Sequence, residues 1–305
     1  MSDAKPPIDD LAKQLKDSLA RSRMRPWKII VPAAAVTIVV LAAVAWWAYP
    51  RTRPDPLQIV ALDAIYLSEE TPRACALIHA PPTETGSRSL GGCTVVFREH
   101  RLNWAPNQKP REMVAHSDKS GKASIEWPVA QAAVTEFLAL YIDSDQKGSG
   151  HELGRIFVWP KDAALLIVDA DETLIDSELD ADAAKILKQA ASDGWHIVYL
   201  CLAGEKGYQF RTARSWLLRH QGRLPVGPVL GRADMDAADV SKARVEILKS
   251  LRSRFPGRML AVVRNAVSAQ ASVDVGCQTL MIGAAPAPPG VTAYPKWADV
   301  SIRAK

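Results

Sequence analysis

The sequence predicts three structural parts: one N-terminal transmembrane helix, an antiparallel β-sandwich, and a C-terminal α/β domain with a Rossmann-like parallel sheet. Three observations support this division. Residues 29–49 carry no charge, short apolar alternations separated by turn residues follow position 56, and apolar runs alternate with helical patterns from position 163. The expected boundaries are a basic tail at 1–28, the transmembrane helix at 29–49, a linker at 50–56, the sandwich at 57–160 and the α/β domain at 161–305.

The composition is that of an ordinary globular protein with one basic end. Of the 305 residues, 48% are hydrophobic and 23% are charged, which excludes wholesale disorder. The net charge of +5 is concentrated in residues 1–28, where seven Lys/Arg stand against four Asp. We therefore expect no nucleic-acid partner. Four cysteines in a chain of this length do not make a disulfide scaffold.

The uncharged run at 29–49 has the length of a membrane span. Its 21 residues would extend over roughly 30 Å as a helix, which matches the hydrocarbon core of a bilayer. Aromatic residues of the kind enriched at membrane interfaces flank it at Trp27, Trp46, Trp47 and Tyr49. We interpret the run as a signal anchor, with a cleaved signal peptide ending near Ala45 as the alternative.

Basic residues on either side of this run set its orientation. Six Lys/Arg lie between positions 13 and 28, whereas only Arg51 and Arg53 follow the run closely. The positive-inside rule then predicts a single-pass membrane protein. Its N-terminus would be cytoplasmic, and the domains after residue 50 would be exported to a periplasmic or other extracytoplasmic space.

The middle region reads as seven short strands, which is typical of an antiparallel β-sandwich. Asp118 and Gly121 bracket a turn within HSDKSGKASIEWP, and this stretch is similar to the Asp-x-x-Gly turn of immunoglobulin-like and transthyretin-like modules. Cys75 and Cys93 would face each other in a hairpin centred on Glu84, so a disulfide and two buried thiols both remain open. The expected strands are 57–66, 72–79, 91–98, 111–116, 122–127, 134–142 and 152–159.

Strands and helices alternate in the C-terminal region, and this pattern predicts a parallel sheet covered on both faces. In such sheets the binding site forms beyond the carboxyl ends of the strands, near the switch in strand order. The expected strands are 164–168, 197–202, 226–230, 259–263 and 278–282, and the expected helices are 181–193, 209–220, 241–254 and 266–274.

The first strand of this region ends in two carboxylates that are two residues apart, Asp169 and Asp171. Like charges held together need a cation, and oxygen ligands of this kind suit Mg²⁺. One carboxylate can attack phosphorus to form an aspartyl-phosphate, while the other protonates the leaving oxygen and then activates water. The alternative is a solvated acidic turn at the start of a helix.

LLIVDADETLID, at 165–176, resembles the first motif of the haloacid dehalogenase-like hydrolase superfamily. The resemblance covers 163–284 and is greatest to the lipin-like phosphatase branch, through WHIVYLCLAGEKGYQFRTARSWL and LPVGPVL. It implies that Asp169 is the nucleophile and a metal ligand, that Asp171 is the acid/base and a second ligand, and that Thr173 binds phosphate. The spacing leaves no room for a large cap, so the resemblance implies an open, capless site that the sandwich could cover.

The other three motifs of that superfamily are altered. The Ser/Thr of the second motif falls at Cys201, a poor hydrogen-bond donor. The Lys of the third motif falls at Arg244, with Lys242 nearby, and either cation could bind phosphate. The fourth motif gives Asn265, an uncharged metal ligand. The position of its usual acid is Ala269, and Arg264 replaces its Gly.

Two functions follow from these observations. The first is a membrane-anchored, Mg²⁺-dependent phosphohydrolase that acts on a lipid-linked or protein-linked phosphate. The second is a catalytically degenerate domain that serves as a binding or scaffolding module in the cell envelope. The intact Asp-x-Asp pair favours the first function, and the changes at Cys201, Arg264 and Ala269 favour the second. The oligomeric state stays open.

Overall fold

A computed structural model describes residues 13, 16–17, 58–79, 90–101, 109–129, 134–142, 149–175, 178–202, 207–231, 240–283 and 285–302. The chain divides into two compact units, 1–55 and 56–305. No helix within these described ranges is long and apolar enough to cross a membrane. The predicted span at 29–49 and the linker at 50–56 lie outside them, so both stay predictions.

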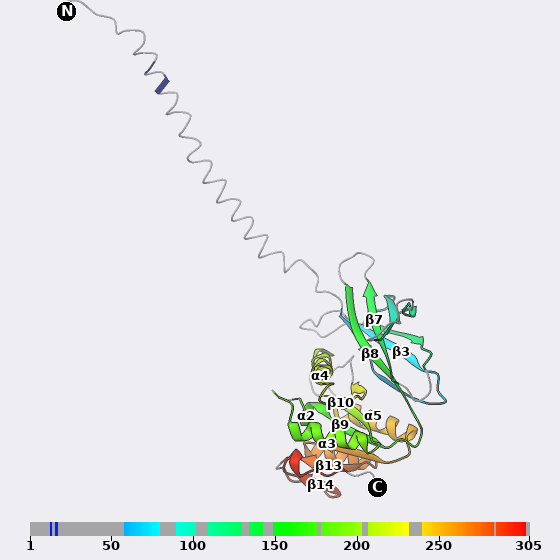
Figure 1. Ribbon diagram of the computed structural model, residues 1–305, viewed down its shortest axis with the longest axis vertical. Helices are drawn as coiled ribbons and strands as arrows, with labels where there is room; N and C mark the ends of the chain where they lie inside the picture. The colour runs from blue at the N-terminus through cyan, green and yellow to red at the C-terminus, as the bar shows by residue number, and fades with distance from the viewer. Residues whose placement is uncertain are drawn as a thin grey trace, which may run out of the picture. The chain divides into compact units, whose positions relative to one another are not determined.

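The second unit is a mixed α/β structure that contains an antiparallel sheet, a mixed sheet and a parallel sheet (Figure 1). The first two sheets are built from the region predicted to be a sandwich. Their strands are β1 (Gln58–Leu62), β2 (Ala64–Leu67), β3 (Arg73–His79), β4 (Thr94–His100), β5 (Glu112–His116), β6 (Lys122–Glu126), β7 (Val134–Ile142) and β8 (Ser149–Trp159).

The two sheets have the orders β1-β3-β6 and β2-β8-β7-β4-β5. All seven expected strands are present, but the first is divided at Asp63, where the chain passes from one sheet to the other. Because of this crossing, β2 runs parallel to β8, which differs from the purely antiparallel pairing expected. Side chains of both sheets meet in one core around Phe97, Phe137 and Trp127.

The turn predicted at Asp118 forms as expected. Its Oδ1 accepts hydrogen bonds from the N–H groups of Ser120 and Lys122, and Gly121 adopts a φ of 77°, which favours glycine. The hydrogen bonds from Ser120 and Lys122 hold the pKa of Asp118 below its usual value. The wider immunoglobulin-like resemblance stays a prediction.

Cys75 and Cys93 do not face each other across a hairpin. Strand β3, which contains Cys75, pairs with β1 and β6, whereas β4, which begins just after Cys93, pairs with β5 and β7. Both thiols are free, and the Cys75 Sγ contacts the Ser124 Oγ at 3.4 Å. The structure thus has the free-thiol alternative, and the hairpin on which the disulfide alternative was based does not form.

The third sheet is parallel, with the order β11-β10-β9-β12-β13-β14. The order runs outward from β9 in both directions, which places the switch point at β9, the strand that ends in Asp169. Its strands are β9 (Leu165–Asp169), β10 (His196–Cys201), β11 (Val229–Gly231), β12 (Met259–Val263), β13 (Gln278–Ile282) and β14 (Val291–Tyr294), the last of which was not expected.

Helices cover both faces of this sheet. The helices are α2 (Ala170–Thr173), α3 (Ala181–Ser192), α4 (Gly207–Arg219), α5 (Val240–Arg254), α6 (Ala266–Asp274) and a 3₁₀ turn, η2 (Trp297–Asp299). Buried residues of α3 and α4 pack against Leu166 and Val168 of β9. Those of α5 pack against Leu165 and Ile167 on the opposite face. Asp180 is the N-cap of α3, and its Oδ1 accepts hydrogen bonds from the N–H groups of Asp182 and Ala183.

A buried group of charges joins the β-sandwich to the α/β domain. The Asp63 carboxylate accepts hydrogen bonds from Arg155, from the Arg214 guanidinium at 2.8 Å and from the Val229 N–H at 2.9 Å. Arg214 on α4 also pairs with Glu152 at 2.9 Å. These groups fix the sandwich against α4 and the edge strand β11.

The sandwich also contacts the amino ends of the central strands. Trp159 packs on His196, the first residue of β10, with ring centroids 4.7 Å apart, and on Phe255, which follows α5. These contacts lie opposite to the carboxyl ends of the strands. They do not place the sandwich as a lid over Asp169, because its packing surface is the other end of the sheet and the β11 edge.

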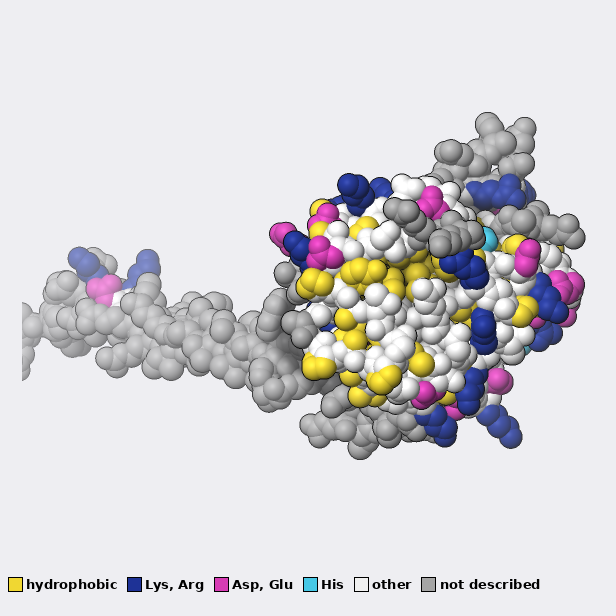
Figure 2. Space-filling view, turned by 90° about the horizontal axis from the view of Figure 1, so that it is seen from below, with side chains coloured by type: hydrophobic (Ala, Val, Ile, Leu, Met, Phe, Trp, Pro, Cys, Tyr) yellow, Lys and Arg dark blue, Asp and Glu magenta, His cyan; other side chains and the backbone are white. Residues whose placement is uncertain are grey.

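Charged side chains of both signs are interspersed over the face seen in Figure 2, with apolar side chains gathered near its middle. Large apolar side chains that are strongly exposed within the described ranges stand far apart in sequence, at Val114, Val134, Val226 and Val267. Single exposed apolar residues are ordinary on protein surfaces and need no partner to explain them.

Candidate active site

Asp169 ends β9 at the centre of the parallel sheet, and its side chain is only 1% exposed. Strand side chains alternate between faces, so Asp169 points to the same face as Ile167, the face covered by α5. The next residues turn at once into the short helix α2, which holds Asp171, Glu172 and Thr173 just beyond the strand. The predicted carboxylate pair therefore lies at the switch point of the sheet.

Arg244 provides the positive charge beside Asp169. It lies on α5, its side chain is 4% exposed, and its Nη1 forms an ion pair with the Asp169 Oδ2. No described residue donates an aligned hydrogen bond to either carboxylate oxygen of Asp169. Burial raises the pKa of Asp169 to about 7 against the opposing effect of Arg244, and the charges of Glu172 and Asp171 raise it further.

Glu172 links three parts of the site, although the sequence alone assigns it no role. Its carboxylate pairs with Arg244 at 3.2 Å and accepts hydrogen bonds from the Arg264 N–H, the Asn265 side-chain amide and the Ser268 hydroxyl. These groups follow β12, whose end lies beside that of β9. Its position directly after Asp171 is the only sign in the sequence that Glu172 belongs to the site. Its partners could not be predicted, because they lie 72 to 96 positions away.

Asp171 lies in hydrogen-bonding contact with the Cys201 thiol at the end of the neighbouring strand β10. Burial and the nearby charges of Asp171 and Asp169 raise the pKa of Cys201 well above its usual value, so this thiol is neutral at pH 7. Cys201 is thus beside the carboxylate pair, where the resemblance places it, but as a buried group whose hydrogen-bonding partner is Asp171.

The other predicted phosphate-binding residues occupy different positions. The hydroxyl of Thr173 is buried and donates to the Asp169 carbonyl at 2.6 Å, which closes the turn of α2. Lys242 is exposed at the start of α5, two residues before Arg244. Of the two candidate cations, Arg244 is the one in contact with Asp169.

Asn265 begins α6 and is occupied by local contacts. Its Oδ1 accepts a hydrogen bond from the Ser268 N–H at 2.8 Å, and its Nδ2 donates to Glu172. The carbonyl expected to bind metal thus serves as the cap of a helix. Ala269 is fully buried with Val263 and Met281, in an apolar environment where a carboxylate would be costly.

The described residues supply part of a Mg²⁺ site. They contain no group of three or more His, Cys, Asp or Glu side chains placed to hold a metal ion. Asp169, with no hydrogen bond to its oxygens, and the neighbouring Asp171 have the right donor chemistry. Mg²⁺ is often bound by one or two carboxylates together with water and substrate phosphate. The pair fits that open arrangement, whereas Asn265 as placed does not add a third ligand.

Comparison with known proteins leaves the family unassigned. No family model matches the chain, and no curated protein matches it. Among solved structures, the D,D-heptose 1,7-bisphosphate phosphatase from B. bronchiseptica, complexed with magnesium and phosphate, is 11% identical with a TM-score of 0.37. The match covers 44% of this chain and 94% of that one.

Two further structures resemble parts of the chain. The superoxide reductase from Ignicoccus hospitalis is 9% identical over 37% of this chain and 86% of its own, with a TM-score of 0.23. The YadV chaperone is 11% identical over 34% of this chain and 51% of its own, with a TM-score of 0.19. At TM-scores below 0.5, none of the three likenesses carries an argument about function.

Proposed function

We propose that the α/β domain is a phosphohydrolase in which Asp169 is the nucleophile and Asp171 the acid/base. The observation that carries this proposal is the environment of Asp169. A carboxylate that is 1% exposed, paired with Arg244 and located at the switch point of a parallel sheet is costly to a fold. Strongly perturbed groups of this kind concentrate at catalytic sites. The resemblance of LLIVDADETLID to the dehalogenase-like superfamily supports the same roles.

In the proposed reaction, an Asp169 oxygen attacks phosphorus and the bond to the leaving oxygen breaks. Asp171 gives a proton to that oxygen and then takes one from the water that cleaves the aspartyl-phosphate, which releases phosphate and restores Asp169. Arg244 moves from Asp169 to the phosphoryl group, because a guanidinium can donate two parallel hydrogen bonds to two phosphoryl oxygens.

Mg²⁺ would neutralise charge on the phosphoryl oxygens, held by Asp169 and Asp171. Further roles for Cys201, Thr173 and Lys242 at phosphate, and for Asn265 at the metal, belong to the same proposal and would require their side chains to leave the contacts described above.

The cellular setting in this proposal rests on the sequence alone. The uncharged run at 29–49 would anchor the protein, with residues 1–28 in the cytoplasm and the two domains exported. The substrate would be a lipid-linked or protein-linked phosphate. Protease added to intact cells, with the outer membrane permeabilised where there is one, should digest residues after 50, and full protection of them would contradict this orientation.

Phosphate release is the direct test of activity. The full chain in nanodiscs should release phosphate from an aryl phosphate in the presence of Mg²⁺, and Asp169→Asn should abolish the release. Asp162→Asn, which changes an exposed Asp seven residues earlier, is the matched control and should keep full activity.

A binding or scaffolding module is the second candidate, and the commitment of Asn265 to helix capping together with the apolar setting of Ala269 favours it. This candidate predicts no phosphate release. It also predicts no rise in melting temperature on addition of Mg²⁺, because only a ligand that binds the folded state raises that temperature.

A further inference from the structure

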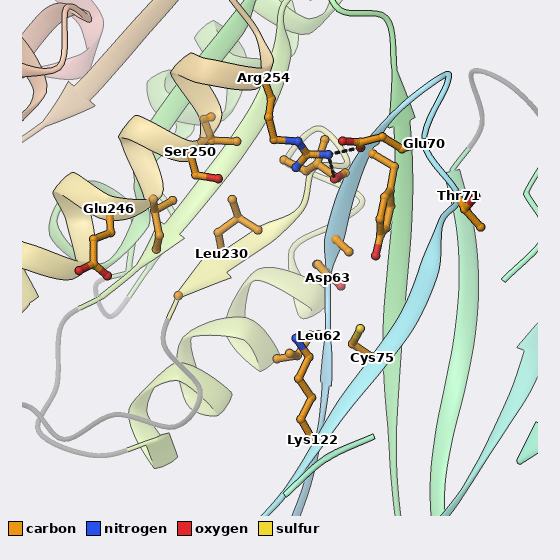
Figure 3. Close-up of a pocket in the computed structure, with 16 residues that line it drawn as sticks. Leu62, Asp63, Glu70, Thr71, Cys75, Lys122, Leu230, Glu246, Ser250 and Arg254 are labelled. Carbon is orange, nitrogen blue, oxygen red and sulfur yellow. Dashed lines mark hydrogen bonds and ion pairs between the residues drawn. The ribbon is translucent and has the colours of Figure 1, made fainter. Parts of the chain in front are cut away.

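A cavity of about 740 Å³ lies between the β-sandwich and the α/β domain (Figure 3). Strand β2 and residues of the β1-β3-β6 sheet form one wall, and β11 and α5 form the other. Cavities of this volume at domain boundaries are typical of sites that bind small molecules.

The inner walls of this cavity are largely apolar. Leu62, Leu230 and Ile247 are only partly buried, so each presents apolar surface to the opening between the domains. Ile65 and Leu251 are buried behind them. Partly exposed aliphatic side chains on facing walls gain free energy when an apolar group displaces water from between them.

Polar groups lie at the ends and rim of the cavity. Arg254 donates to the Ile65 carbonyl at 2.7 Å and pairs with Glu70, which fixes α5 against β2 at one end (Figure 3). Lys122 and Glu246 are exposed and come from opposite walls. The cavity therefore has largely aliphatic inner walls and a charged rim, and the buried Asp63 that also lines it is paired with Arg155 and Arg214.

Strand register relates the cavity to Asp169. Asp169 is level with Leu200 of β10, and the next residue, Cys201, is level with Gly231 of β11. Gly231 lines the cavity, so the cavity begins two strands from Asp169, roughly 10 Å away at the usual spacing of about 4.8 Å between strands.

The cavity and the carboxylate also lie on the same face of the sheet. Leu230 packs with the buried side chains on the α5 face, the face to which Asp169 points. Helix α5 spans both places, since it carries Arg244 at Asp169 and Ile247, Leu251 and Arg254 in the cavity.

We propose that this cavity binds the apolar substituent of a phosphate ester whose phosphoryl group is at Asp169. The inference rests on the proposed phosphohydrolase function and selects, between lipid-linked and protein-linked phosphates, the class with an aliphatic chain. Binding of the apolar substituent in the cavity would hold the phosphoryl group in position at Asp169, although the cavity residues do not contact that group. Residues of the cavity are thus specificity-determining, not catalytic.

Decyl phosphate and ethyl phosphate are suitable probes, since they differ only in the length of the chain and a decyl chain is long enough to extend from Asp169 into the cavity. With the full protein in nanodiscs, we expect kcat/KM for decyl phosphate to exceed that for ethyl phosphate at least tenfold. Ile247→Asp should reduce this ratio to near one. Val267→Asp, which adds the same charge at a 66% exposed position of α6, should preserve the ratio.

A second variant keeps the test decisive if Ile247→Asp fails to fold. Ser250→Trp fills the cavity from an exposed position of α5 and should lower the ratio without loss of melting temperature. Equal values for the two esters in the wild-type protein, or a ratio that Ile247→Asp and Ser250→Trp leave unchanged, would overturn the inference while the hydrolase proposal stands.

Direct binding separates failure of this inference from failure of the proposed function. If the wild-type protein hydrolyses neither ester, decyl phosphate should still bind at least tenfold more tightly than ethyl phosphate in calorimetry, and Ser250→Trp should remove the difference. If neither ester is hydrolysed but the binding difference is present, the result contradicts the phosphohydrolase proposal and leaves the cavity proposal intact. Absence of the binding difference contradicts the cavity assignment, including the case in which the cavity serves a peptide.

Discussion

Asp169 and Glu172 are close in sequence, yet their surroundings differ in kind. Asp169 is buried with one ion pair and no aligned hydrogen bond from a described residue, so its charged form is poorly solvated. Glu172 is also mostly enclosed, but it accepts from four groups. The surroundings of Asp169 therefore lower the stability of the fold and leave a carboxylate that can react. Those of Glu172 hold neighbouring segments of the chain together. Arg244 belongs to both.

The raised pKa of Asp169 predicts a pH dependence of stability. Its folded-state pKa of about 7 lies above the unfolded value of 3.8, so between these values the folded state binds the extra proton. Stability is therefore lost as the pH rises through this window. Relative to wild type, Asp169→Asn should become progressively more stable from pH 4 to 8, by a few kcal/mol at most.

Urea unfolding at several pH values, without divalent ions, checks this prediction. Asp162→Asn is the control and should give a difference from wild type that does not vary with pH. A constant difference between Asp169→Asn and wild type would mean that Asp169 ionises in the folded protein much as it does in the unfolded chain.

Removal of the Glu172 charge should loosen the site. In Glu172→Gln, the buried guanidinium of Arg244 loses one of its two carboxylates, and donors from Arg264, Asn265 and Ser268 meet an amide group. We expect a loss of about 1–3 kcal/mol in the free energy of unfolding. Glu178→Gln, an exposed Glu, should change it by less than about 0.5 kcal/mol. Equal effects of the two variants would contradict the linking role of Glu172.

At the scale of elements, helix ends in the α/β domain are set by local sequence. Asp180 caps α3 and Asn265 caps α6, and each does so through a side-chain oxygen that accepts from backbone N–H groups of the first turn. The two caps differ in their surroundings, because Asn265 also donates to Glu172. The α3 cap therefore isolates the stability effect of capping from effects on the site.

Asp180→Ala should lower the free energy of unfolding by about 1 kcal/mol, since the N–H groups of Asp182 and Ala183 lose their acceptor. Chemical denaturation measures the change. Asp182→Ala removes an acid of the same first turn that is not the cap and should cost less. An Asp182→Ala effect as large as that of Asp180→Ala would assign the stabilisation to the helix dipole instead of the cap.

For the whole molecule, the buried charges around Asp63 join the two domains. The side chains of Asp63 and Arg214 are fully buried and that of Arg155 is 2% exposed, and they come from a strand junction, a helix and a strand. Because a buried charge needs a partner, the sandwich cannot shift against α4 without a large electrostatic cost. The cavity proposed to bind an apolar chain lies between the surfaces that this group fixes.

Asp63→Ala should cost about 3–5 kcal/mol in the free energy of unfolding, because it leaves two buried guanidinium groups without their shared carboxylate. Arg73→Met breaks the exposed pair with Glu126, at 3.3 Å, and should cost at most about 1 kcal/mol. Thermal or chemical unfolding distinguishes them. A small effect of Asp63→Ala would show that the domains are joined mainly by their apolar contacts, such as those of Trp159.

Much of the fold could be predicted from local pattern. The four long helices, the first five strands of the parallel sheet and the sandwich strands follow from apolar runs and from apolar periods of 3.6 and 2, which depend on near neighbours only. Strand β14 was missed because its four residues are all at least partly exposed and show no such period. The carboxylate pair was found because Asp169 and Asp171 are adjacent in sequence to one strand end.

The sequence by itself determined the order of the elements and the acidic strand end, since each depends on a short segment, whereas the position of the switch point depends on which strands pair. Only the tertiary structure decided which groups face that strand end. Arg244 is the cation at Asp169, Glu172 joins residues up to 96 positions away, and Asp63 meets Arg214 across 151 positions. Such pairings depend on how the sheets and helices pack against one another. The distances that result cannot be derived from the number of residues between two positions in the chain.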